Sequence, residues 1–273
     1  MSFHPNMKFI DLSIPLINPD ELIFDPPYSR PKIEYIDHTV GGKSMSFVFP
    51  KLKPDEHLPD GKGWAVESIT ISTHNGTHMD APWHFAPIQD REIGERKAKT
   101  IDEFPLEWGI GPLVVLNTRD YEDGYVLTPY DIDKKLEDIS HKLQEGDILC
   151  ILTSASKHSG TADYINYGAG VGKDATLHII RQGVHVVGTD GWSWDAPFSV
   201  TAQKWKESIE AQKPNPSIIW EGHFAGIELG YFQIEKLTNL DKVPPTGATI
   251  YCFPIKIARA SAGWVRAVAT ISE

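Results

Sequence analysis

The sequence contains only two cysteines in 273 residues, Cys150 and Cys252, and each lies in an apolar run. Two cysteines in a chain of this length exclude a disulfide framework as the source of stability. A chain this long can instead bury a substantial core. We therefore expect both thiols to be buried and chemically inert in strands.

Positive charge is also scarce. The 26 Lys and Arg residues stand against 37 Asp and Glu, which leaves a formal net charge of −11 at pH 7. Nucleic acids and anionic membrane surfaces are bound through a basic face. The charge balance therefore disfavours both partners and leaves a small molecule as the expected one.

Long apolar runs are missing as well. No stretch approaches the ~20 residues that a helix needs to cross a bilayer. The N-terminal segment, residues 1–8, also lacks the apolar part of a secretory signal peptide. These two absences predict a cytoplasmic protein.

The sequence shows no internal repeat, no low-complexity tract and no clear linker, so we expect a single domain over residues 1–273. Residues 50–64 are polar and rich in turn formers, which predicts a surface loop or flap between strands. Apolar runs and alternating patterns predict strands, and helices with recognisable start and stop residues fall between them. This order predicts an α/β fold with a mixed sheet. The predicted strands cover residues 9–14, 68–72, 112–116, 147–152, 184–188, 248–253 and 264–271, and the predicted helices cover residues 129–143, 174–182 and 201–212.

The most informative stretch holds three histidines and an aspartate within eleven residues: His74, His78, Asp80 and His84. Imidazole and carboxylate groups are ligands that zinc prefers, and they also suit manganese or iron. A lone histidine is more often structural or solvated than metal-binding. Three of them with an aspartate rarely gather by chance, so the cluster favours a metal site.

The backbone around this cluster is predicted to turn. Pro82 and the pair Asn75-Gly76 disfavour a helix, whereas Gly76 allows a tight turn that brings His74 and His78 together. If the piece after the turn is extended, Asp80 points to the same side as His78, because side chains two residues apart share a face of a strand.

The same stretch resembles the signature His-x-Gly-Thr-His-x-Asp-x-Pro-x-His of the cyclase family of metal-dependent hydrolases, whose members include enzymes that hydrolyse isatin and N-formylkynurenine. Residues 9–16 resemble the opening strand of the family, and residues 188–197 resemble a later conserved loop. Every fixed position of the signature is filled: His74, Gly76, Thr77, His78, Asp80, Pro82 and His84.

The resemblance implies a swivelling β/β/α domain that forms a homodimer or a larger homo-oligomer. It also implies that His74, His78 and Asp80 bind a divalent metal, Mn²⁺ or Zn²⁺. Some members hold a second ion with a distant histidine and a glutamate twelve residues later, and His223 and Glu235 match that pair. One or two ions therefore stay open.

The last histidine of the signature, His84, is implied to act in catalysis. A divalent ion lowers the pKa of its bound water towards ~7, and a histidine beside it can serve as the general acid and base for the leaving nitrogen. The expected reaction is hydrolysis of a non-peptide C–N bond, in a cyclic amide such as isatin or an aryl formamide such as N-formylkynurenine.

Aromatic side chains near the motifs are candidates for a flat apolar pocket that binds the substrate. We expect Trp83, Phe85 and Trp194 to line it. Packing in the core is the competing interpretation, because aromatic residues make up 10% of the chain.

Two other functions stay open: a lactone or dienelactone hydrolase with the same metal site, and a metal-binding module without turnover. A phosphate loop is excluded at residues 168–174, because Tyr167 replaces the first glycine and Asp174 replaces the Ser or Thr. The sequence also lacks the Gly-x-Ser-x-Gly elbow of serine hydrolases.

Overall fold

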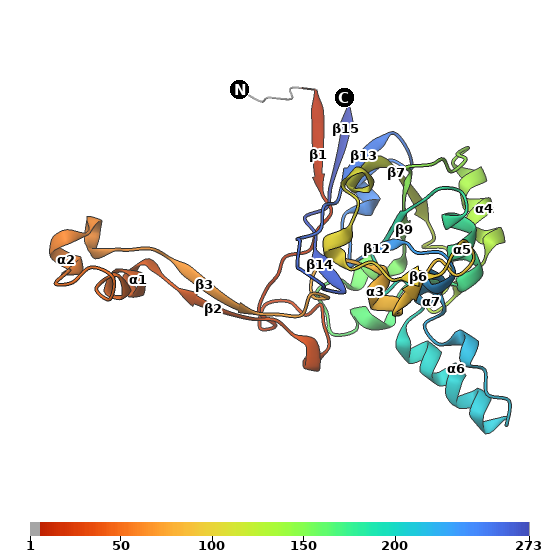
Figure 1. Ribbon diagram of the computed structural model, residues 1–273, viewed down its shortest axis with the longest axis horizontal. Helices are drawn as coiled ribbons and strands as arrows, with labels where there is room; N and C mark the ends of the chain where they lie inside the picture. The colour runs from red at the N-terminus through yellow and green to blue at the C-terminus, as the bar shows by residue number, and fades with distance from the viewer. Residues whose placement is uncertain (1–5, 273) are drawn as a thin grey trace.

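The computed structural model describes residues 6–272; residues 1–5, where the N-terminal segment begins, and residue 273 lie outside the described part. A nine-stranded mixed sheet forms its centre (Figure 1). The strand order is β1 (Met7–Asp11), β15 (Val268–Ser272), β13 (Ala248–Tyr251), β7 (Ile110–Asn117), β9 (Ile148–Leu152), β11 (Val186–Thr189), β12 (Phe232–Glu235), β4 (His78–Asp80) and β14 (Ala262–Trp264). The four central strands, β7, β9, β11 and β12, run parallel. Antiparallel strands extend the sheet at both ends. The expected α/β fold with a mixed sheet is confirmed.

Side-chain alternation along the central strands gives the sheet two buried faces. Cys150 of β9 and Ile234 of β12 belong to one core cluster, whereas Leu149 and Ile151 of β9 belong to the other. Parallel strands that are apolar throughout require cover on both faces. Helices cover the second face: α4 (Pro129–Asp138), α5 (Lys173–Ile180) and α7 (Glu221–Glu228). Both cysteines are free and buried, as expected.

Two helix boundaries differ from the sequence-based expectation by three residues or more. Helix α4 begins as predicted, with the hydroxyl of Thr128 as its cap, but it ends at Asp138 and not at residue 143. The reason is local, because Ser140 adopts a left-handed backbone with φ of 53°. Helix α6 (Phe198–Glu210) begins before the predicted residue 201 and projects from the body of the molecule (Figure 1).

The run at residues 264–271 was predicted as one strand, and this prediction is wrong. The structure divides it into β14, which pairs with β4, and β15, which pairs with β13 and β1. These two strands lie near opposite ends of the sheet order, yet only residues 265–267 connect them. The sheet therefore curls until its ends approach one another.

A two-stranded arm extends away from the sheet (Figure 1). It consists of β2 (Lys32–Ile36) and β3 (Val66–Thr70), with α1 (His38–Met45) and α2 (Pro54–His57) at its tip. The predicted loop at residues 50–64 lies between these two strands, but it contains α2. Helix α1 was not predicted, because it carries Gly41 and Gly42. Both glycines allow close packing: a Cβ at Gly41 would lie 1.7 Å from the carbonyl oxygen of Trp64.

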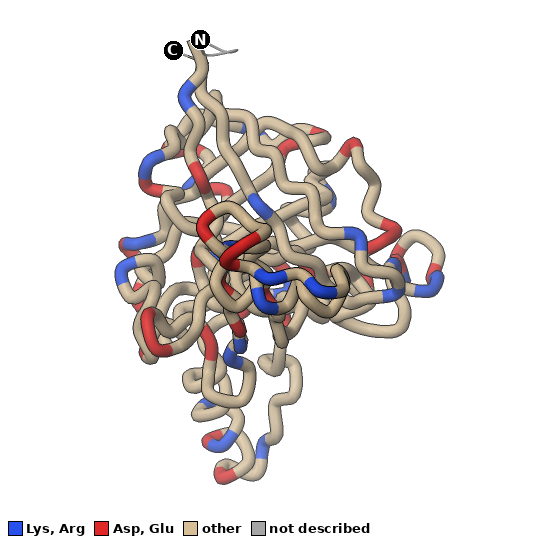
Figure 2. Tube along the Cα trace, turned by 90° about the vertical axis from the view of Figure 1, so that its left-hand side faces the viewer, with Lys and Arg blue, Asp and Glu red and all other residues tan. Residues whose placement is uncertain are grey.

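Two short ribbons complete the described fold: β5 (Ile88–Gln89) with β6 (Arg96–Lys97), and β8 (Val126–Leu127) with β10 (Gly170–Val171). Figure 2 shows Lys and Arg interspersed with Asp and Glu along the chain. None of the helices within residues 6–272 has the length and apolar character needed to cross a bilayer.

Candidate metal centre

Strand register brings four polar side chains onto one face of the sheet. In β4, Met79 points into the core, so His78 and Asp80 point to the opposite face. The antiparallel register places His78 across from Glu235 and Asp80 across from Gln233. Directly opposed residues of such a pair have Cβ atoms ~4.5–5.5 Å apart, so two neighbouring strands supply a compact polar cluster.

A glycine turn brings His74 to this cluster, as predicted. Gly76 has φ of 62°, a conformation that favours glycine. A Cβ there would also lie 2.5 Å from the side chain of Leu16. The turn places the ring centroids of His74 and His78 5.1 Å apart.

Two short helices supply the remaining histidines. His84 lies in α3 (Pro82–Phe85), which follows β4 directly, and its ring lies 4.1 Å from that of His74. His223 lies in α7, and its ring lies 5.7 Å from that of His84. Both helices pack on the face of the sheet that carries Asp80.

Asp80 lies at the centre of the four histidines. Its Oδ1 is 2.9 Å from Nδ1 of His74 and 3.3 Å from Nε2 of His78. Its Oδ2 is 3.8 Å from Nε2 of both His84 and His223. The candidate ligand atoms of His74, His78 and Asp80 lie within 4.8 Å of one another, as do those of Asp80, His84 and His223.

Glu235 connects the two groups. Its Oε2 is 3.5 Å from Nε2 of His78, and its Oε1 is 3.5 Å from Nε2 of His223. The structure thus brings together all six residues that the sequence analysis proposed for metal binding and catalysis.

Two buried atoms in this cluster lack a hydrogen-bond partner among the described residues: Nε2 of His78 and Oδ1 of Asp80. The contact from His74 to that oxygen therefore lacks hydrogen-bond geometry. Buried polar groups are almost always satisfied, and an orphaned one costs about 1–3 kcal/mol. The two atoms lie 3.3 Å apart, so a single divalent cation would satisfy both. The donor set fits a metal ion such as zinc or manganese.

The charges in the cluster suit a cation. Burial alone would raise the pKa of Asp80, but the neighbouring His78 and His84 hold that pKa well below its ordinary value. Burial and the nearby charge of Asp80 raise the pKa of Glu235, but the contact with His223 and the charges of His223 and His78 together outweigh them, so the net shift is downward. Desolvation lowers the pKa of His84 to about 4. The site therefore holds two carboxylates and a neutral His84 at neutral pH.

Residues that the sequence analysis did not assign orient the candidate ligands. Nδ1 of His223 hydrogen-bonds to the carboxylate of Asp195, which also accepts the backbone N–H of Gly222 at 2.7 Å. This contact fixes the ring and directs Nε2 into the site, as is usual for metal-binding histidines. Asp195 follows the Trp-Ser-Trp motif in the sequence, but nothing in that motif marks it as a partner of His223.

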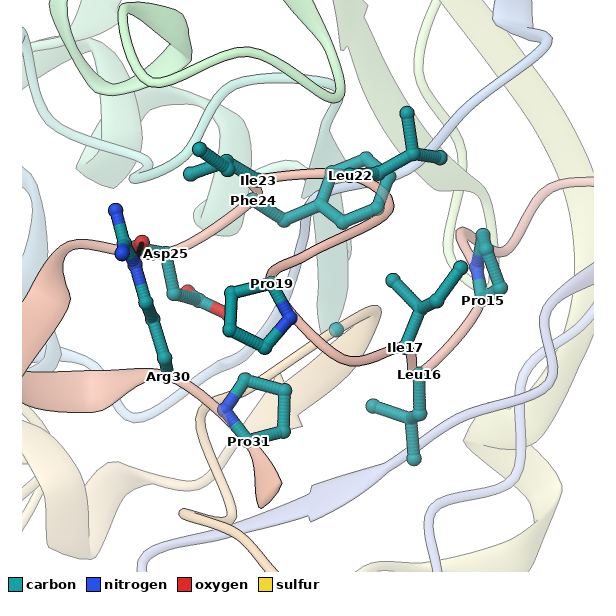
Figure 3. Close-up of a pocket in the computed structure, with 11 residues that line it drawn as sticks. Pro15, Leu16, Ile17, Pro19, Leu22, Ile23, Phe24, Asp25, Arg30 and Pro31 are labelled. Atoms are coloured by element: carbon teal, nitrogen blue, oxygen red, sulfur yellow. Dashed lines mark hydrogen bonds between the residues drawn. The ribbon is translucent and has the colours of Figure 1, made fainter. Parts of the chain in front are cut away.

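A buried ion pair supports the glycine turn from behind. Lys236 is 1% exposed, and its Nζ lies 2.5 Å from Oδ1 of Asp25. The other oxygen of Asp25 accepts a hydrogen bond of 2.7 Å from the side chain of Asn75, next to His74. Figure 3 shows Asp25 on the N-terminal segment, in a small pocket that Gly76 also lines.

The aromatic residues expected to line a pocket lie in different surroundings. Trp83 is 38% exposed beside His84. Phe85 and Trp194 are buried in the core at 3% and 1% exposure, and the indole N–H of Trp194 donates to Thr176 at 2.9 Å. Both rings are packed in the core, so neither offers open surface to a substrate.

Trp220 was not assigned from the sequence, but its ring contacts two histidines of the candidate site. Its ring stacks on His223 at 4.2 Å and meets the ring of His84 edge-on at 5.0 Å. It directly precedes α7 and has a left-handed backbone, with φ of 53°. It also belongs to an apolar groove formed with α6, lined by Phe198, Thr201, Ala202, Trp205, Ile219 and Phe224.

Comparison with known proteins gives consistent relatives. The profile of the family described as "Putative cyclase" matches residues 10–196. An isatin hydrolase of Roseibium aggregatum is 25% identical over 230 residues, which cover 81% of this chain and 80% of that protein. A kynurenine formamidase of Salinibacter ruber is 26% identical over 201 residues, or 74% and 77% of the two chains. The structure of isatin hydrolase A from Labrenzia aggregata, bound to benzyl benzoate, superposes with a TM-score of 0.71 at 25% identity, over 98% of this chain and 95% of that one. This superposition confirms the expected β/β/α fold type.

Proposed function

Because the chain belongs to the cyclase family, we propose that it is a metal-dependent hydrolase of a cyclic amide or an aryl formamide. Relatives named isatin hydrolase and kynurenine formamidase support amide hydrolysis at the level of the family. The choice of substrate is the finer part of the proposal.

The observation that carries the proposal is the pair of orphaned atoms, Nε2 of His78 and Oδ1 of Asp80. Their burial would be costly without a ligand, and a divalent ion shared with His74 satisfies them. We assign these three residues as ligands. His223 and Glu235 lie next to these ligands, and both contact Gln233.

An ion held there supplies a Lewis acid and lowers the pKa of a bound water to ~7. His74 and His84 are the partly exposed members of the cluster, with side chains 27% and 25% exposed, so substrate approaches on their side. The carboxylate of Asp80 stays ionised and lies beside both rings, 2.9 Å from Nδ1 of His74 and 3.8 Å from Nε2 of His84. A carbonyl group placed between these histidines faces the ligand cluster.

His84 moves the proton in this scheme. It is neutral at neutral pH because desolvation lowers its pKa to about 4, so it can accept a proton at Nε2 from the attacking water. The same nitrogen then returns the proton to the leaving amide nitrogen, whose C–N bond breaks. Trp220 meets the ring of His84, and Trp83, the residue before His84, is exposed; both supply flat apolar surface for an aromatic substrate.

We further propose that the chain forms a homo-oligomer through its arm. A two-stranded ribbon is marginally stable by itself, and this one carries exposed apolar side chains. Phe47 at the tip is 93% exposed and Tyr35 on β2 is 62% exposed. A second copy of the chain would cover them, so Phe47→Ser should lower the mass measured by light scattering from that of an oligomer towards that of one chain.

The test of the proposed activity is a hydrolysis assay on purified protein reloaded with Mn²⁺ or Zn²⁺. Isatin, N-formylkynurenine and an aryl lactone serve as competing substrates. The proposal expects turnover of one of the two amides that disappears with a chelator and returns with the ion. Preference for the lactone would favour the ester-cleaving alternative, and binding of metal without turnover of any of the three would favour a metal-binding module.

A further inference from the structure

Gln233 lies at the point where the second group of candidate ligands meets. It is fully buried in β12, on the same face as Glu235 and across from Asp80. Its amide nitrogen lies 2.7 Å from Nε2 of His223, 2.9 Å from Oε1 of Glu235 and 3.3 Å from Oδ2 of Asp80. One neutral group thus contacts an atom of each of the three residues that the family resemblance matches to a second ion, Asp80, His223 and Glu235.

The partners fix which way the amide points. Carboxylate oxygens of Asp80 and Glu235 only accept hydrogen bonds, so the NH₂ group must face them. The carbonyl oxygen of Gln233 then faces the hydroxyl of Tyr231, which donates at 3.0 Å. Nδ1 of His223 faces Asp195, so Nε2 is the ring atom that faces the amide group, at 2.7 Å.

The two halves of the cluster differ in how well the hydrogen bonds of their buried polar atoms are satisfied. In the half formed by His74, His78 and Asp80 Oδ1, two buried atoms have no partner among the described residues. In the other half, Gln233 contacts each candidate ligand atom, and Oε1 of Glu235 also accepts the backbone N–H of Trp194 at 3.1 Å. Only the first half therefore needs a cation.

We propose that the side-chain amide of Gln233 takes the place of a second cation, so that the chain binds one divalent ion, at His74, His78 and Asp80. This inference rests on the proposed function for the existence of the first site. A second ion would need the same three atoms at ~2.0–2.2 Å, and the amide nitrogen of Gln233 now occupies the space between them. The amide group holds Asp80, His223 and Glu235 together in the way that an ion would.

The experiment counts ions. Metal-free protein is titrated with Mn²⁺, and bound metal per chain is measured by mass spectrometry after removal of free ions. We expect the wild type to bind one ion, with any second ion at least a hundredfold weaker. In Gln233→Ala the second group of ligands loses its donor, so a second ion should bind within about tenfold of the first. Electron paramagnetic resonance should show isolated Mn²⁺ in the wild type and a coupled pair in the variant.

The matched control is Gln89→Ala. Gln89 is also buried, at 3% exposure, and its amide contacts Asp90 and the backbone of Lys99 outside the metal centre. This variant should keep one ion per chain. Two ions of similar affinity in the wild type, or one ion in a folded Gln233→Ala, would overturn the inference. The wild-type count decides alone if the variant does not fold, and no ion in the wild type would remove the proposed function instead.

Discussion

The ammonium group of Lys236 donates a hydrogen bond of 2.8 Å to the backbone carbonyl oxygen of His74, 162 residues earlier in the chain. The same group forms a buried ion pair with Asp25. The backbone of His74, a candidate ligand, is thus held by the side chain of Lys236, which follows Glu235 in the sequence. The two halves of the candidate metal centre are therefore connected through Lys236, outside the cluster, as well as through Glu235 inside it.

We expect Lys236→Met to destabilise the fold strongly. Removing one partner of a buried ion pair leaves an uncompensated charge, which costs about 3–5 kcal/mol. Urea unfolding of metal-free protein measures this loss, and the double variant with Asp25→Leu should recover part of it. Lys32→Met, which removes the exposed pair with Glu34, is the control and should change little. A loss no greater than that of the control would contradict the assigned role of Lys236.

We expect His84→Ala to keep its metal and lose turnover by ~10²–10⁴-fold, the usual contribution of general acid–base catalysis. Metal content and kcat are measured on the same preparation. His178→Ala provides a control, because that partly exposed histidine contacts Asp133 on the surface. Loss of the metal from His84→Ala would instead identify this residue as a ligand.

Removal of the metal should lower the melting temperature. A ligand that binds only the folded state adds about 2.7 kcal/mol of stability at a hundredfold excess over its Kd. Thermal unfolding with Mn²⁺ and with a chelator measures the difference, and His78→Ala should abolish it. Equal melting temperatures of the wild type in both conditions would argue against the metal site.

Asp190 should make stability fall as the pH rises from about 4 to 6. Burial raises the pKa of Asp190 to about 6 in the folded protein, from the ordinary value of 3.8. Below that window the carboxyl is neutral in both states; within it, only the unfolded state gives up the proton, so unfolding is favoured by up to about 3 kcal/mol. Asp190→Asn keeps a neutral acceptor for Thr153 and should remove this fall. Urea unfolding of metal-free protein at pH 4.5 and pH 7 tests it, and identical differences in both proteins would contradict the assignment.

The sequence predicted the local part of the site well, because its geometry is local. The turn at Gly76 and the two-residue period of β4 place His74, His78 and Asp80, and both can be deduced from neighbouring residues. Gln233 was within reach of the same reasoning, since it precedes Glu235 by two residues and shares its face of the strand.

The rest depends on contacts between distant segments. Asp25, Asp195 and Trp220 have no local pattern that connects them to the ligands, and only the folded chain brings them to the site. The arm was hard to predict for another reason. Gly41 and Gly42 weaken the helical pattern of α1, but they allow its close packing on residues 61–64.

Strand β4 has a consequence for the order in which the molecule can be made. Its neighbours in the sheet are β12 and β14, so Asp80 pairs with residues 233 and 262. Pairing between such distant segments is slow to form, and during synthesis it must wait until both have left the ribosome. The signature histidines emerge early, yet they acquire their sheet neighbours only when almost the whole chain exists. Capture of the proposed ion is therefore expected late in biosynthesis, and a chain truncated before residue 230 would carry the signature without the two strands that pair with β4.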